Sequence, residues 1–148
     1  PLNQIQAGKA KTRGVELEAT TRIASHVDLI GTYTWTKARP DDGTLVAGVP
    51  KNQASAWGVY HVNDADSDGF SFGVGARYIG TNYDETGTLK VPAKTLFDAM
   101  VAYTQGPWRF SVNAANVTDQ AYNASCLARG DCFYGPRRSI VGTASYKF

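Results

Sequence analysis

The chain has 148 residues, with 15 Lys and Arg, 13 Asp and Glu and a formal net charge of +2, so no strong field favours nucleic acid or an acidic partner. A hydrophobic content of 43% is too high for a disordered chain, and the length indicates one domain over residues 1–148. No run approaches the roughly 18 apolar residues of a transmembrane helix, but a transmembrane β-barrel stays open because its signal is alternation.

Apolar and polar residues alternate with period two along the chain, in stretches rich in Val, Thr, Tyr, Phe and Trp. This pattern is typical of half-buried strands, and no apolar stripe has the 3.6-residue period of a helix. We therefore predict an all-β chain of about eight antiparallel strands without helices. In chain order they cover residues 2–6, 14–23, 26–36, 53–61, 70–78, 97–103, 108–114 and 138–148.

The connections between these strands alternate in length. Residues 24–26, 63–68 and 105–107 form short turns, whereas residues 38–50, 80–92 and 117–136 form long connections. Successive antiparallel strands bring all short turns to one end of the sheet and all long connections to the other. Bacterial outer-membrane barrels have this asymmetry, with short periplasmic turns and long extracellular loops.

Aromatic residues on the apolar face gather near the two ends of the strands. The group near the short turns contains Tyr60, Phe70, Tyr103, Trp108, Tyr146 and Phe148, and the group near the long connections contains Tyr33, Trp35 and Tyr78. Small residues lie between them. Two aromatic belts around a smooth band suit a lipid slab, whereas a soluble core needs its large residues at the centre. We therefore predict that the apolar face meets lipid and the charged face lines a wet lumen.

Three architectures share this pattern. Eight strands can close into a small barrel, which would be an outer-membrane protein with a structural or adhesive role. The same strands can instead be one wall section of a larger barrel. A soluble eight-stranded ligand carrier of the lipocalin type is the third alternative.

Several segments, in order along nearly the whole chain, resemble the TonB-dependent siderophore receptors. The matching segments are Arg13–Ala19 (RGVELEA), Pro50 with Gln53–Trp57 (QASAW), Gly75–Gly80 (GARYIG), Asn116–Tyr122 (NVTDQAY), Tyr134–Arg138 (YGPRR) and Ser145–Phe148 (SYKF). The last loop resembles that of the ferrichrome-type, hydroxamate members. The resemblance implies a 22-stranded outer-membrane barrel with an N-terminal plug domain, which this chain lacks. It also implies import of a ferric siderophore, powered by the TonB complex through the missing N-terminal region.

Two cysteines, Cys126 and Cys132, are the only ones in the chain and stand close together in its last long connection. The spacing suggests a disulfide in an oxidising compartment, with two free thiols or a metal pair as alternatives. In a receptor, this disulfide would stiffen the last extracellular loop. Aromatic and apolar loop residues are the candidate siderophore contacts: Tyr83, Leu127, Phe133 and Tyr134. Relatives of the ferrichrome type have an aromatic residue where Leu127 stands.

The chain ends in Tyr146 and Phe148 on the apolar face, which resembles the signal that the outer-membrane assembly machinery reads from a last strand. Lipid or lipopolysaccharide is the further expected partner. We recognise no Ser/His/Asp set, paired catalytic carboxylates or phosphate loop, and therefore expect no enzyme, no metal site and no cofactor. The Asp64–Asp68 segment has the opening spacing of a calcium loop without its closing Glu, and is interpreted as a solvated turn.

Overall fold

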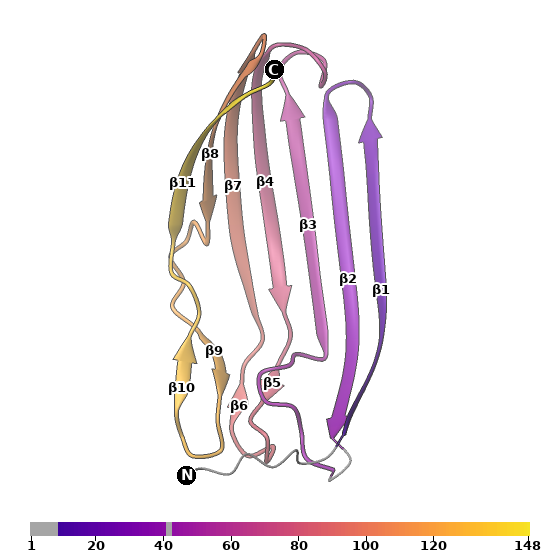
Figure 1. The fold of residues 1–148 in the computed structure, drawn as a ribbon, viewed down its shortest axis with the longest axis vertical. Helices are drawn as coiled ribbons and strands as arrows, with labels where there is room; N and C mark the ends of the chain where they lie inside the picture. The colour runs from indigo at the N-terminus through magenta and orange to yellow at the C-terminus, as the bar shows by residue number, and fades with distance from the viewer. Residues whose placement is uncertain (1–8, 41–42) are drawn as a thin grey trace.

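The computed structural model describes residues 9–40 and 43–148, and these ranges contain strands and no helix. Seven strands form one antiparallel sheet in the order β1-β2-β3-β4-β7-β8-β11 (Figure 1). They are β1 (Ala10–Ile23), β2 (Val27–Pro40), β3 (Asn52–His61), β4 (Gly69–Ile79), β7 (Lys94–Gln105), β8 (Trp108–Ala115) and β11 (Ser139–Tyr146). The all-β antiparallel prediction is confirmed, and the predicted strand at residues 2–6 lies outside the described residues.

Two short hairpins extend the sheet at one end. They are β5 (Asn82–Tyr83) with β6 (Lys90–Val91), and β9 (Asn123–Cys126) with β10 (Cys132–Tyr134). Figure 1 shows both hairpins at the end where the long connections lie, while the short turns and the C-terminus lie at the opposite end. The predicted separation of short turns from long connections is therefore confirmed. No helix long and apolar enough to cross a membrane occurs in the part of the chain described here.

Strand register joins the apolar residues into continuous rows across the sheet. One row runs through Ala19, Gly31, Ala56, Ala76 and Phe97, and another through Val27, Tyr60, Phe72, Val101, Val112 and Gly142. Because paired residues share a face in an antiparallel sheet, one whole face is apolar. We call this the outer face, and the opposite, polar face the lumen face.

The outer face does not close over a dry core. Leu17, Val101 and Val112 are 61%, 37% and 45% exposed. Among the described residues, the large side chains with less than 2% exposure are Leu96, Val91, Asn82, Asn116 and Asp84. The apolar side chains at the centre of the sheet therefore point outward, as the membrane interpretation requires.

Aromatic rings form two groups of contacting side chains at the short-turn end of the outer face. The Phe70 and Tyr103 rings lie 4.7 Å apart between centroids, and Trp108 lies 4.9 Å from Tyr146, which in turn lies 5.2 Å from Phe148. Rings at these separations pack favourably, and the amphipathic ones suit a membrane–water boundary. At the other end, Tyr33, Ala54 and Tyr78 share one row.

The sheet has two separate edges, β1 and β11, which lie on opposite sides of Figure 1 and do not pair with each other in the described residues. A self-closing barrel requires pairing between its first and last strands. The described strands therefore form an open wall, the geometry expected of a section of a larger barrel.

Candidate ligand-binding loops at one end of the sheet

The long connections meet in one layered assembly beyond the ends of the strands. Leu45 and Gly48, between β2 and β3, donate backbone hydrogen bonds to the carbonyls of Glu85 and Tyr83 in the β5–β6 hairpin, at 3.0 and 3.1 Å. The Gly48 backbone also lies against Ser125 of β9, because a Cβ at Gly48 would stand 2.9 Å from the Ser125 Cβ. Three loops that are far apart in sequence are thus packed against one another.

A buried carboxylate organises the β5–β6 hairpin. Asp84 is fully buried and accepts hydrogen bonds from the Thr86 and Thr88 hydroxyls and from the Leu89 N–H. Burial alone raises the pKa of this carboxyl, but these donors outweigh it and lower the pKa to about 2. The carboxylate therefore stays ionised at neutral pH and fixes the hairpin turn.

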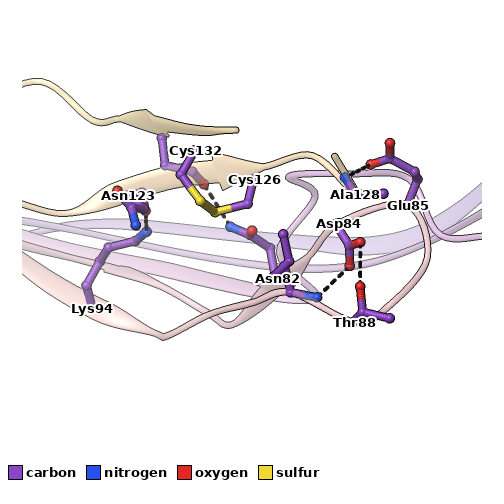
Figure 2. The surroundings of a disulfide bond; sticks show 11 residues. Asn82, Asp84, Glu85, Thr88, Lys94, Asn123, Cys126, Ala128 and Cys132 are labelled. Atoms are coloured by element: carbon purple, nitrogen blue, oxygen red, sulfur yellow. Dashed lines mark hydrogen bonds between the residues drawn. A yellow bond between two sulfur atoms is a disulfide. The ribbon is translucent and has the colours of Figure 1, made fainter. Parts of the chain in front are cut away.

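The β9–β10 hairpin is closed by a disulfide between Cys126 and Cys132, drawn in Figure 2. Two hydrogen bonds join it to the β5–β6 hairpin. Asn82 Nδ2 donates to the Ala124 carbonyl at 3.0 Å, and the Ala128 N–H donates to Glu85 Oε2 at 3.2 Å. Cys126 is buried in this contact. Because these hydrogen bonds join the two hairpins, each hairpin restrains the conformation of the other.

Lys94 anchors the same assembly to the wall. Its buried ammonium donates to the Asn123 carbonyl at 2.5 Å and lies 4.7 Å from the centre of the Tyr122 ring. A cation over an aromatic face is attracted by the ring's electron density. The base of β9 is therefore fixed to the first residue of β7.

Asn116 fixes the chain reversal after β8. It is buried, has a positive φ of 51°, and its side chain bonds the Gln120 backbone and the Pro136 carbonyl. Its N–H donates to Asp98 Oδ1 at 2.8 Å, and Asp98 is paired with Arg77 on the lumen face. Asn tolerates the left-handed backbone better than most residues, which explains its use here.

A second clamp in this loop joins Asp119 to Arg137. The guanidinium donates to both carboxylate oxygens at 2.9 and 2.6 Å, and the Arg138 N–H donates a third bond at 3.0 Å. These donors, Arg137 first, lower the pKa of Asp119 to about 2. Arg137 therefore pairs with a loop carboxylate in the described structure.

The four predicted ligand contacts lie on the two cross-linked hairpins. Tyr83 is on β5, Leu127 follows β9, and Phe133 and Tyr134 are on β10. Tyr83, Phe133 and Tyr134 are 38%, 52% and 80% exposed. Tyr83 lines a pocket of about 350 Å³, together with Trp35, Lys37, Arg39, Leu45 and Lys51 among others. The structure therefore brings all four residues to one end of the wall.

The lumen face holds a chain of hydrogen bonds that the sequence analysis missed. Asp28 pairs with Arg22 at 2.7 Å and with His61 Nε2 at 3.1 Å, and His61 Nδ1 lies 2.9 Å from Ser71 Oγ. We expected no Ser/His/Asp set, and this was wrong in that Asp28, His61 and Ser71 lie close together. They are far apart in the sequence, and three neighbouring strands, β2, β3 and β4, bring them together. We interpret these hydrogen bonds as a partly buried polar network that joins neighbouring strands of the wall.

The acidic turn before β4 is also satisfied internally. Asp66 accepts from Arg22 at 3.0 Å, and Asp68 accepts from the Gly106 N–H at 3.0 Å. Ser67 donates its N–H to the Asp64 carbonyl at 2.8 Å. Within residues 9–40 and 43–148, no group of three or more His, Cys, Asp or Glu has metal-binding geometry.

Trp57 packs on the lumen face over two glycines of β4. A Cβ added at Gly75 would lie 1.9 Å from Trp57 Cε3, and one at Gly73 would lie 2.8 Å from Trp57 Cζ2. Glycine is therefore required for the indole to cover the neighbouring strand.

Comparison with known proteins places this wall in a family. The family model described as "TonB dependent receptor-like, beta-barrel" matches residues 1–117. The ferrichrome outer membrane transporter/phage receptor of Escherichia coli K12 is 34% identical over 155 residues, which cover 97% of this chain and 21% of that protein. The ferrioxamine receptor of Yersinia enterocolitica is 34% identical over 158 residues, which cover 97% of this chain and 22% of that protein. The chain thus spans about a fifth of the length of these relatives.

Solved structures agree on the fold. The ferric-catecholate import receptor Fiu from E. coli K12, in its closed form, superposes with a TM-score of 0.74 at 28% identity, covering 95% of this chain and 21% of that one. The yersiniabactin receptor FyuA of Yersinia pestis gives 0.75 at 21% identity, covering 96% and 24%, and supports the fold alone. The chain belongs to the TonB-dependent receptor family, as a section of its outer-membrane β-barrel.

Proposed function

We propose that the protein containing this chain imports a ferric siderophore of the hydroxamate group across the outer membrane, powered by the TonB complex. Residues 1–148 would serve as barrel wall, outer loops and last strand, while a plug and the TonB contact would come from other parts of the protein. The relatives named for ferrichrome and ferrioxamine support this choice, at 34% identity over nearly the whole chain. A catecholate siderophore receptor matches at 30%.

The observation that carries the proposal is the loop assembly. Backbone hydrogen bonds join the connection before β3 to the β5–β6 hairpin, and the Asn82–Ala124 and Glu85–Ala128 hydrogen bonds join that hairpin to β9–β10, so the three form a firm platform. Three aromatic residues on this platform, Tyr83, Phe133 and Tyr134, keep large exposed areas. Flat aromatic rings on a pre-organised surface lose little entropy when they contact a chelate, and Tyr adds a hydrogen bond.

Transport needs no chemical step from this chain, and we propose that it has no catalytic role. The relatives are named as transporters and receptors. The Asp28–His61–Ser71 chain lies on the lumen face near the short-turn end, far along the strands from the aromatic loop residues. Its partners are all other wall groups, which supports a structural role.

The test is siderophore binding and iron uptake by the full-length receptor with Phe133→Ala and Tyr134→Ala. We expect each change to weaken binding of ferrichrome or ferrioxamine B by about tenfold, a typical loss for an aromatic contact. Lys90→Ala, an exposed change on the neighbouring hairpin, is the control. Unchanged binding in both aromatic variants would refute the assignment of these residues.

The last strand is proposed as the assembly signal. β11 pairs with β8 on one side only among the described residues, which leaves its other edge for another strand. Tyr146 packs on Trp108, and the Phe148 ring lies 5.2 Å from that of Tyr146 but is otherwise exposed. Removing Phe148 should lower the amount of folded receptor in the outer membrane while its synthesis stays the same. An unchanged folded amount would argue against this role.

A further inference from the structure

Arg77 lies on the lumen face of β4 and reaches diagonally to Asp98 on β7. The guanidinium donates from Nε and Nη2 to the two carboxylate oxygens, at 2.5 and 2.9 Å. The Asp98 side chain is 13% exposed and that of Arg77 is 43% exposed. Two hydrogen bonds between planar groups fix both side chains, whereas a lysine ammonium would leave the carboxylate free to turn. Arg77 therefore holds Asp98 in one orientation from the lumen side.

Asp98 uses the same carboxylate to hold the start of the last long connection. The last residue pair between β7 and β8 at this end is Ala99 with Ala114. Just beyond it, the Asn116 N–H donates to Asp98 Oδ1 at 2.8 Å. Because β8 ends at Ala115, Asn116 is the first residue of the connection. The Asp98 carboxylate thus joins the lumen wall to the last extracellular loop.

The Asn116 side chain clips the two legs of this loop together. Its Nδ2 donates to the Gln120 carbonyl on the outgoing leg at 3.0 Å and to the Pro136 carbonyl on the returning leg at 3.2 Å. Its Oδ1 accepts from the Gln120 N–H at 3.0 Å. Asn116 is buried, so water replaces these bonds only if the loop opens. The β9–β10 hairpin lies between the two legs, and its position depends on this one amide.

The hairpin carries three of the four predicted ligand contacts: Leu127, Phe133 and Tyr134. Among the described residues, no hydrogen bond, ion pair or cation–ring contact joins Arg77 to any of the three. A change at Arg77 therefore reaches these side chains through Asp98 and Asn116. We call Arg77, Asp98 and Asn116 the wall-to-loop relay.

We propose that Arg77 is a positioning residue for siderophore binding, which acts through Asp98 and Asn116 on the placement of the last loop. A shift of the two legs moves the ligand contacts of the hairpin together, so an ion pair on the lumen face sets the geometry of an extracellular surface. Arg77 itself does not touch the ligand. The inference rests on the proposed function for the identity of that ligand, whereas the coupling of wall and loop is tested without any ligand.

The first experiment measures hydrogen exchange of residues 117–136 in the full-length receptor. Arg77→Gln removes the two-point contact, and Arg77→Lys keeps the charge without it. Asn116→Asp keeps the size of the side chain but loses the amide donors. Arg22→Gln is the matched control, because it breaks an arginine–carboxylate pair with Asp28 at the opposite end of the same face. We expect about tenfold faster exchange of residues 117–136 in the three relay variants, the effect of losing a hydrogen bond to a charged or buried group, and no change there in the control.

The second experiment measures ferrichrome binding by the same full-length variants. We expect Arg77→Gln to raise the Kd about tenfold, and Arg22→Gln to leave it unchanged. In a receptor that already carries Phe133→Ala and Tyr134→Ala, Arg77→Gln should have no further effect, because the contacts that it positions are then absent. A residue that touched the ligand directly would lower the affinity in both backgrounds.

The two experiments together decide between positioning, direct contact and general stability. Loop exchange in the relay variants equal to that in the control would overturn the coupling, and faster exchange throughout the strands of the wall would reduce the ion pair to a support of the whole barrel. Faster loop exchange with an unchanged Kd, or an equal loss of affinity with and without the two aromatic rings, would overturn the positioning role. If the unchanged receptor does not bind ferrichrome, the proposed ligand is wrong, and the exchange result by itself decides whether wall and loop are coupled.

Discussion

A lysine at the centre of the outer face should destabilise the folded receptor strongly. Ala99 pairs with Val74 and Ala114, four residues from Tyr103 in the lower belt and four from Thr95, which pairs with Tyr78 in the upper one. At about 3.3 Å per residue and a tilt of roughly 40°, it lies about 10 Å in depth from each belt. The belts then span about 20 Å, close to the roughly 25 Å apolar band of outer-membrane barrels.

We expect Ala99→Lys to cost about 2–4 kcal/mol, the range measured for a cation at the bilayer midplane. The measurement is the free energy of unfolding of full-length receptor refolded in lipid vesicles, followed by Trp fluorescence in denaturant. Ala99→Met carries similar length without charge and should cost less than half as much. Asn113→Lys, which lies opposite Met100 on the lumen face, should change stability by about 0.5 kcal/mol or less.

Equal unfolding free energies for Ala99→Lys and Ala99→Met would contradict the outer-face assignment, because the lysine ammonium would then be hydrated at this position. A large destabilisation by Asn113→Lys would contradict it as well. Either result would reverse the assignment of the outer and lumen faces.

Three further changes test the packing and the loops. Gly75→Val should cost about 1–3 kcal/mol by overpacking against Trp57, and less when combined with Trp57→Ala, while Gly142→Ala, with open space around its Cβ, should be neutral. Reduction of the loop disulfide should remove up to about 2–2.5 kcal/mol from loop stability and speed proteolysis there, with the remaining barrel still folded. The Asp119–Arg137 ion pair should stabilise the loop fully above pH 3.8, the ordinary pKa of Asp. This stabilisation should be lost as the pH falls toward the pKa of Asp119, about 2. Asp119→Asn should abolish this pH dependence, measured by hydrogen exchange of the loop.

Alternation in the sequence predicts the wall well because lipid and water impose opposite demands on neighbouring residues. All seven long strands occur where the pattern places them, and the ring contacts of the lower belt follow from the same alternation. The ends are less well predicted. β1 begins at Ala10 and β2 extends to Pro40, because charged residues beyond the lipid no longer alternate with apolar ones.

The loop hairpins could not be predicted from alternation. Strands of two to four residues show no period, and they exist because buried groups such as Asp84 and Asn82 fix them. The spacing of Cys126 and Cys132 indicated one of these hairpins, β9–β10. The Asp28–His61–Ser71 chain needed the register of three strands, which no local spacing encodes.

The residues that pair across the strands of the wall indicate which positions have a functional role. On the outer face, the paired residues between the two aromatic belts have small or apolar side chains, so contact with lipid is sufficient for them. At the loop end, the Arg13–Lys37 and Lys11–Arg39 pairs place like charges opposite each other, and Tyr134 is 80% exposed on the β9–β10 hairpin. Sequences whose local choices conflict with the stability of the fold usually do so at functional positions. Both features lie at the loop end, one on the outer face of β1 and β2 and the other on the β9–β10 hairpin.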